Sequence, residues 1–183
     1  MRLGNFSVEI PRGNYLDSGY VAMKHNTKYA LRLCNFGDLH CDAEVEIDGK
    51  PVGAWRVPSN GRIVIERPVH DTGCFTFYKI GTGEAKKAEL VCSEKLGLIT
   101  VLFKPEKKVD QGFSVLQMNL LRTTARKAGG TGLSGKSEQE FRTVQPLDYD
   151  ETGFVRINLR LVCETDEPRP LTPVSTPVPP SLL

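Results

Sequence analysis

The stretch from residue 43 to residue 68, AEVEIDGKPVGAWRVPSNGRIVIERP, constrains the fold more than any other part of the sequence. Apolar residues alternate with glutamates over residues 43–47, a period of two that is typical of a strand with one buried face. The Asp48-Gly49 step that follows favours the positive φ angles of a tight hairpin turn, and Asn60-Gly61 repeats the signal. The stretch therefore predicts three consecutive antiparallel strands, and Pro68 should end the third or leave it at a sheet edge.

Short apolar or alternating runs, separated by Gly, Pro, Asn and Asp, continue along the chain as far as Cys163. With 183 residues, 39% of them hydrophobic, the chain is long enough for one packed domain and too short for two large ones. We predict an all-β fold, an antiparallel sandwich over residues 1–163 with at most one short helix, within residues 82–97 and capped by Gly97. The predicted strands are Phe6–Ile10, Tyr29–Cys34, Ala43–Ile47, Ala54–Val57, Arg62–Glu66, Phe75–Ile80, Leu98–Phe103, Phe113–Met118 and Val155–Cys163.

Two segments lack a strand pattern. Residues 119–140 are rich in glycine and have no apolar period, so we expect a long loop that is mobile or is ordered by a partner. Residues 164–183 contain six prolines, which predicts an extended C-terminal tail with polyproline II character. Within this tail, Pro170 to Pro173 and Pro177 to Pro180 each fit P-x-x-P, a pattern that docks on partner proteins or merely occurs in a plain tether.

Residues 130–137, GTGLSGKS, fit the phosphate-loop pattern G-x-x-x-x-G-K-[ST]. A nucleotide-binding loop also needs a buried strand before it and a helix after it. Here LLRTTARKA precedes the glycines with three cations, and the residues that follow reach Pro146 without an apolar helical face. We therefore expect the glycines to shape a loop for packing or for a partner, with Lys136 incidental; simple anion binding by backbone amides stays open.

Other groups of reactive residues have plainer interpretations. The adjacent pair His70-Asp71 is typical of a turn between two strands, because neighbouring side chains on an extended chain point to opposite faces. Cys34, His40 and Cys41 do not form the recognisable ligand pairs of a structural zinc site. Trp55 is the single tryptophan, and we expect it to pack in the core; its alternative role is a ligand anchor. No catalytic residue, metal or cofactor is predicted.

Charge and cysteine content limit the partners and the compartment. Lys and Arg total 24 against 22 Asp and Glu, so the net charge of +2 provides no general attraction to nucleic acid or to a membrane surface. The N-terminus lacks the apolar region of a signal peptide, and no apolar run is long enough to span a membrane. We expect an intracellular protein in a reducing compartment, or a component of a virus particle, with five free thiols: Cys34, Cys41, Cys74, Cys92 and Cys163.

Several phrases together resemble an uncharacterised all-β domain family associated with large DNA viruses of algae and protists and with some of their hosts. The phrases are YALRLCN, VEIDGKPVGAWRVPSNGRIVIERP, FTFYKIGTGEA, GGTGLSGKS and INLRLV, which lie within residues 29–162. The resemblance implies a jelly-roll-like or sandwich domain used for binding or assembly, as in a minor component of a virus particle. It implies no catalytic residues.

These observations lead to one leading hypothesis and two alternatives. The leading one is a noncatalytic structural or interaction module, associated with a capsid or another assembly, that presents its glycine-rich loop and proline-rich tail to a partner protein. The second is a glycan-binding or anion-binding module that uses Trp55 or the basic loop, and the third is a nucleotide-binding enzyme. The candidate partner-binding residues are Gly130, Gly132, Gly135, Lys136, Pro170, Pro173, Pro177 and Pro180.

Overall fold

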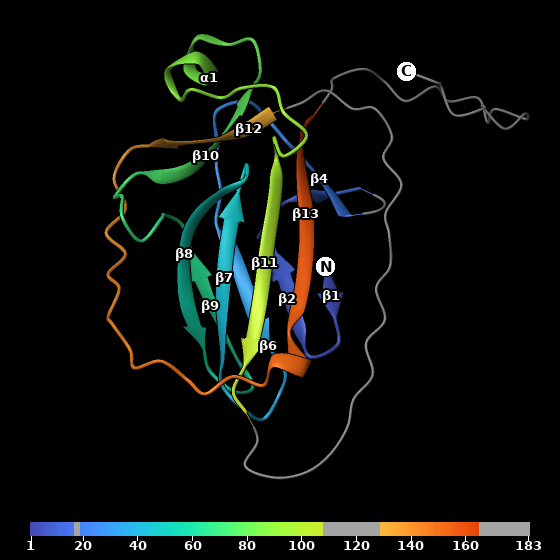
Figure 1. Ribbon diagram of the computed structural model, residues 1–183. Coiled ribbons are helices and arrows are strands. Elements are labelled where there is room, and N and C mark those ends of the chain that lie inside the picture. Colours follow the sequence, from blue (N-terminus) through green and yellow to red (C-terminus); the bar gives the residue numbers. More distant parts are fainter. Residues whose placement is uncertain (17–18, 108–128, 165–183) are drawn as a thin grey trace, which may run out of the picture.

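The structure, a computed structural model, describes residues 1–16, 19–107 and 129–164 and consists of two layers of β-strands (Figure 1). The first layer is a six-stranded sheet in which β13 and β4 run parallel and all other neighbours run antiparallel. Its strands, in spatial order, are β3 (Asn14–Tyr15), β4 (Tyr20–Met23), β13 (Val155–Cys163), β11 (Leu98–Pro105), β7 (Cys41–Ile47) and β8 (Lys50–Val57).

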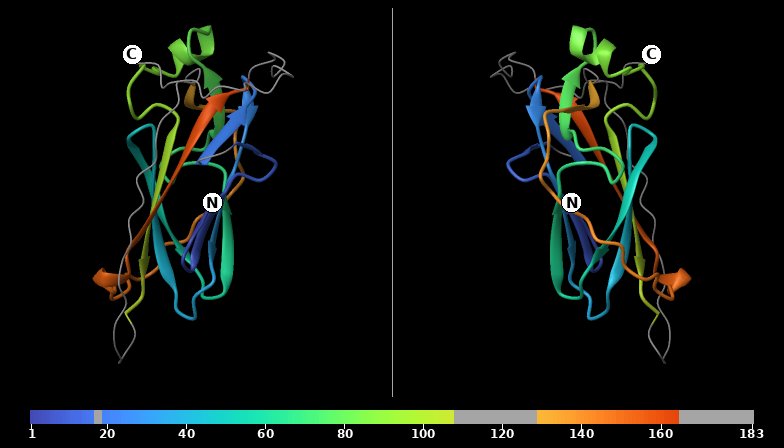
Figure 2. Two further views of the ribbon diagram at one scale, coloured as in Figure 1. Left: turned by 90° about the vertical axis from the view of Figure 1, so that its right-hand side faces the viewer. Right: turned by 90° about the vertical axis from the view of Figure 1, so that its left-hand side faces the viewer.

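The second layer, seen beside the first in Figure 2, is made of two smaller antiparallel sheets. The chain passes from one small sheet to the other between β5 (Thr27–Lys28) and β6 (Leu31–Asn35). Backbone hydrogen bonds continue between them, since Phe75 N–H donates to Glu66 O at 2.8 Å and Tyr29 N–H donates to Phe75 O at 3.0 Å. One sheet contains, in order, β1 (Arg2–Leu3), β2 (Phe6–Glu9), β6 (Leu31–Asn35) and β9 (Gly61–Ile65). The other contains β12 (Gly129–Ser134), β10 (Cys74–Lys79) and β5 (Thr27–Lys28).

A large apolar core fills the space between the two layers. The alternation of β7 explains one face of this core, because Cys41, Ala43, Val45 and Ile47 are buried while the residues between them are not. Phe6 and Phe103 stack across the layers with ring centroids 4.7 Å apart. The same core includes Leu31, Leu33, Phe75, Phe77, Ile157, Leu159 and Leu161.

The predicted all-β sandwich is confirmed, and β13 has the predicted bounds Val155–Cys163. Each of the other strands predicted within the described residues is present with its ends shifted by a few residues, whereas Phe113–Met118 lies outside those residues. The sequence pattern did not predict the short strands β1, β3, β4 and β5, nor β12. The jelly-roll connectivity stays a prediction.

The prediction of three consecutive antiparallel strands is only partly right. Asp48 and Gly49 have φ angles of 53° and 79° and join β7 to β8 in a tight hairpin, as expected. However, β9 pairs with β6 in the opposite layer and is an edge strand there. The buried Asn35 amide holds this corner, because its Nδ2 donates to Pro58 O at 3.2 Å and to Leu39 O at 2.8 Å. Crossing to the other layer lets β8 and β9 both bury their apolar sides in one core.

The predicted short helix is present as α1 (Gly83–Lys87) at one end of the sandwich (Figure 1). Thr82 caps its start, since the Thr82 hydroxyl accepts from Ala85 N–H at 3.2 Å. Gly97 does not cap its end, which corrects that prediction. With a φ of 73°, Gly97 instead lies where the chain enters β11, and a Cβ there would be 2.4 Å from Leu161 O. A short 3₁₀ helix, Glu151–Gly153, precedes β13.

Candidate binding site

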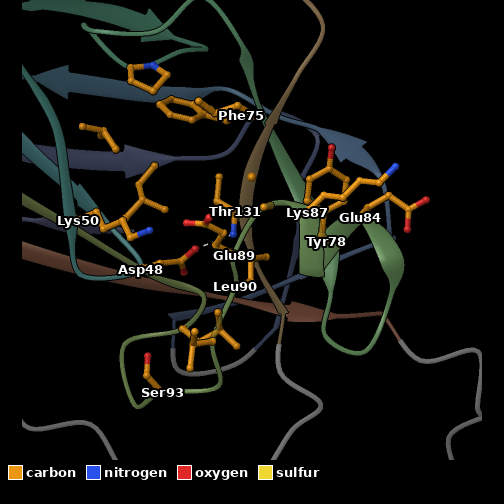
Figure 3. Close-up of a pocket in the computed structure, with 18 residues that line it drawn as sticks. Asp48, Lys50, Phe75, Tyr78, Glu84, Lys87, Glu89, Leu90, Ser93 and Thr131 are labelled. Atoms are coloured by element: carbon orange, nitrogen blue, oxygen red, sulfur yellow. Dashed lines mark hydrogen bonds between the residues drawn. The ribbon is translucent and has the colours of Figure 1, made fainter.

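A pocket with a volume of about 690 Å³ lies at the α1 end of the sandwich, lined from two sides by the edge strands β12 and β8 (Figure 3). Its deeper wall is apolar and includes the buried side chains of Ile47, Phe75 and Leu96. The exposed part of its wall carries charged side chains: Lys50, Glu84, Lys87 and Glu89. An apolar recess with a few charged groups at its mouth is the usual composition of a binding site.

Asp48 joins three segments of the pocket wall. Its Oδ1 accepts from Gly97 N–H at 2.5 Å, and its Oδ2 accepts from Thr131 N–H at 2.7 Å. Burial raises the pKa of Asp48 above its ordinary value, although the two N–H groups act in the opposite direction. The hairpin turn therefore fixes both β12 and the entry to β11 through one carboxylate.

Glu89 ends α1 in a conformation that glycine usually provides. Its φ of 52° is left-handed, its N–H donates to Lys86 O at 3.0 Å, and Leu90 N–H donates to Ala85 O at 3.0 Å. These two bonds form a Schellman motif with Glu89 at the C′ position. In the view of Figure 3, Glu89 lies between Asp48 and Tyr78. A charged side chain is thus kept at the pocket although its backbone is strained there.

The glycine-rich segment was predicted as part of a loop over residues 119–140, and this is wrong for residues 129–134. They form β12, which pairs along its length with β10. A Cβ at Gly129 would lie 2.1 Å from the Phe77 ring, and one at Gly132 would lie 2.5 Å from the Tyr78 ring. The glycines therefore serve packing, because only they allow the strand to approach these buried rings. Residues 119–128 lie outside the described part of the chain.

The structure does not support the phosphate-loop interpretation of residues 130–137. The glycines belong to a strand rather than to a cradle, and no helix follows within residues 135–148. Gly135 takes a φ of 65° at the end of β12, and Lys136 is exposed beside it. Ser137, which would bind the metal of a nucleotide, is buried, and its hydroxyl donates to Glu66 Oε1 at 2.9 Å.

Residues 135–148 form an extended segment that we call the strap, because it runs along the edges of both layers. The Gln139 side chain bonds to β9 and its end: its Nε2 donates to Val64 O at 2.6 Å, and its Oε1 accepts from Glu66 N–H at 3.1 Å. On the β8 side, Arg56 Nη2 donates to Gln145 O at 2.7 Å. Figure 1 shows the strap in orange beside β8 and β9. Lys136 thus lies near the start of a structural segment.

Trp55 is 8% exposed and belongs to the core, which confirms the packing role expected for it. Its ring meets the Phe141 ring edge to face at 5.7 Å between centroids, so the strap covers it. A ring in this position offers almost no surface to a sugar. The alternative role as a ligand anchor would require the strap to leave.

The cysteine and histidine candidates are separated by the fold. Cys34 and Cys41 are buried free thiols on different layers, and all five cysteines are free. Within residues 1–16, 19–107 and 129–164, no three His, Cys, Asp or Glu side chains are grouped to hold a metal ion. His70-Asp71 lies in the turn before β10, where Asp71 Oδ1 accepts from Gly73 N–H at 2.7 Å. This confirms the turn.

The remaining predicted partner-binding residues, Pro170, Pro173, Pro177 and Pro180, lie outside the described residues. Gly132, one of the predicted partner-binding residues, lines the pocket, whereas other lining residues, among them Glu89, Leu90, Val91 and Leu133, were not predicted from the sequence. The signals available in the sequence were the glycine-rich phrase, which contains Gly132, and the Asp48-Gly49 turn, which places Asp48 correctly but does not show what its carboxylate binds.

Among the helices that the structure describes, none has the length and apolar character needed to cross a membrane. Comparison of the chain with protein-family models, with curated proteins and with solved structures finds no match.

Proposed function

We propose that this chain is a noncatalytic interaction module that joins an assembly by binding a partner protein at the pocket end of the sandwich. The observation that carries the proposal is the pocket itself, an apolar recess between two strand edges with a mouth of exposed side chains. Two apolar side chains remain exposed there, Val91 at 74% and Leu133 at 40%. Exposed apolar groups beside an apolar recess are typical of an interaction site.

The side chains that line the pocket also favour a binding role over a catalytic one. Neither His nor Cys lines it in the described part of the chain, and the most buried of its carboxylates, Asp48, is occupied by two backbone N–H groups. The groups left for contact are apolar side chains and the exposed charged side chains of Lys50, Glu84, Lys87 and Glu89. Such a set recognises a surface by shape and charge.

The assembly that we propose is a virus particle, in which the chain would be a minor component. This step rests on the resemblance of five phrases in the sequence to β-domains of large DNA viruses. The proline-rich residues 164–183 would add a second contact to the same assembly. The virus particle and the second contact are proposals that do not follow from the pocket itself.

The test compares two valines of similar chemistry at different places. A photo-crosslinking residue is introduced in place of Val91 at the pocket or in place of Val144, which is 52% exposed on the strap. We expect a defined crosslinked protein only from position 91, identified by mass spectrometry from the native source. The identified protein is then purified, and calorimetry should show that Val91→Asp abolishes binding whereas Val144→Asp does not. Equal crosslinking from both positions, or equal affinities of the two variants, would contradict the proposal.

A further inference from the structure

We infer that the pocket receives an extended segment of the partner protein, which pairs with β12 as an added strand. This inference rests on the proposed function, since it specifies how the partner binds. It starts from the position of β12, an edge strand of its sheet whose residues Thr131, Gly132 and Leu133 line the pocket. Edge strands are the natural template for adding a further strand.

Hydrogen bonds of Thr131 and of the paired strand β10 show in which direction the backbone groups of β12 point. Thr131 N–H donates to Asp48, so the backbone of Thr131 points away from β10. On β10, Phe77 lies opposite Thr131 and Phe75 lies opposite Leu133. Both carbonyls point away from β12, because Phe77 O accepts from Asn26 N–H at 2.8 Å and Phe75 O accepts from Tyr29 N–H at 3.0 Å. Because directions alternate along a strand, Leu133 N–H and C=O also point away from β10.

Three of these outward groups have no hydrogen-bond partner within the part of the chain that the structure describes. No hydrogen bond there reaches Leu133 N–H, Leu133 O or Thr131 O. Upstream, the edge is already covered, because Asp48 holds Thr131 N–H and a Cβ on Gly97 would be 2.7 Å from Gly129 O. An added strand would therefore pair from Thr131 O across Leu133, beside the open part of the pocket.

The pocket wall beside β12 determines which side chains such a strand would carry. Successive side chains of a strand point to opposite faces, so alternate residues would reach the apolar wall of Phe75, Val52 and Leu96. The intervening residues would stay near Lys50 and Glu89 at the exposed rim (Figure 3). The occupant we infer is therefore an extended peptide with apolar residues at alternate positions between polar ones.

The experiment selects the probe first and then tests its backbone. A random peptide library is selected on the full-length protein, and the strongest binder is synthesised with single backbone N-methyl groups at each position. We expect N-methylation at alternate positions to weaken binding by at least about threefold, because each removes one backbone hydrogen bond with β12. Equal effects at all positions, or selection of no peptide, would overturn the inference.

A second measurement does not depend on any variant folding. Amide hydrogen exchange by NMR should show that Leu133 N–H exchanges fast in the free protein, whereas Gly132 N–H, which faces β10, exchanges slowly. The selected peptide should then protect Leu133 N–H. Protection of Leu133 N–H before any peptide is added would overturn the inference, since the edge would already be occupied.

Substitution of Leu133 provides the matched control. Leu133→Pro removes the N–H and should abolish peptide binding, whereas Leu133→Val keeps the N–H and should retain it. The two proposals fail separately. If position 91 crosslinks a defined partner but Leu133 N–H stays unprotected in that complex, the strand pairing is wrong and the proposed function stands. If a peptide pairs with β12 but position 91 crosslinks no partner, the proposed function is wrong.

Discussion

Asp48 combines a turn position, a buried carboxylate and two backbone bonds in one residue. Its positive φ is tolerated by Asp and Asn, which explains why this residue type begins the hairpin turn. Its carboxylate satisfies the N–H groups of Gly97 and Thr131, which β-sheet partners do not reach. The burial that accompanies these bonds makes ionisation of Asp48 costly in the folded state.

Asp48→Asn tests this balance. Asn retains the turn conformation but has one acceptor oxygen, so one buried N–H loses its partner. We expect the free energy of unfolding at neutral pH to fall by about 1–2 kcal/mol, measured by urea denaturation.

The same pair of proteins gives a pH dependence. The raised pKa means that Asp48 binds a proton more tightly in the folded state than in the unfolded state. Ionisation of Asp48 therefore lowers the free energy of unfolding as the pH rises from the unfolded-state pKa through the folded-state pKa. The difference in unfolding free energy between wild type and Asp48→Asn should therefore widen as the pH falls from 7 toward about 4. A constant difference would contradict the raised pKa.

Glu89, unlike Asp48, is a residue type that disfavours the left-handed backbone conformation it has in the structure. Glu89→Gly relieves the left-handed strain at the end of α1, and we expect it to raise the free energy of unfolding by about 0.5–1 kcal/mol. Glu89→Ala is the control, since it also removes the carboxylate but keeps the strain. Thermal unfolding of both variants separates the two effects; equal stabilities would show that the strain is not the cause.

At the level of elements, β12 shows how a glycine-rich sequence becomes a strand. Its own side chains provide almost no β preference, and glycine weakens a strand that stands alone. What forms the strand is its register with the aromatic strand β10, whose Phe77 and Tyr78 rings occupy the space where β12 lacks side chains. The element is therefore specified by its neighbour more than by itself.

Gly129→Ala should consequently be destabilising, by about 1–3 kcal/mol, because its methyl group would overlap the fully buried Phe77 ring. The matched control is Gly83→Ala at the start of α1, where a Cβ meets no atom within 4 Å. That change should leave stability unchanged or raise it, since alanine favours a helix over glycine. Urea denaturation of both variants measures the contrast. Equal stabilities would contradict the packing role of β12.

At the level of the whole molecule, the two layers are held together by the core and closed along one side by the strap. The edges of β8 and β9 lie in different layers, and bonds from Arg56 and Gln139 attach the strap to both. Covering strand edges in this way limits unwanted pairing with other chains. The outer edge of β12 at Leu133 lies beyond this cover, which is why we propose that a partner protein binds there.

The closed core also predicts how the thiols react. Cys34, Cys41 and Cys74 are buried, and burial raises the pKa of Cys41 to about 12, so thiolate formation there is suppressed. Only Cys92 is exposed, and Cys163 is intermediate. A thiol reagent applied to the native protein should modify Cys92 fast and Cys163 more slowly, with the three buried thiols reacting only after denaturation. Fast reaction of all five would mean that the layers separate readily in solution.

The sequence by itself determined the fold class, most strand positions, the Asp48-Gly49 hairpin and the core position of Trp55. These depend on alternation and on turn residues, which are local properties of the chain. The tertiary structure decided the rest: that β9 pairs in the other layer, that GGTGLS is a strand and that Ser137 anchors a strap. It also created the pocket, since β12 and β8 are far apart in sequence. These features arise from contacts between distant segments, which local patterns do not encode.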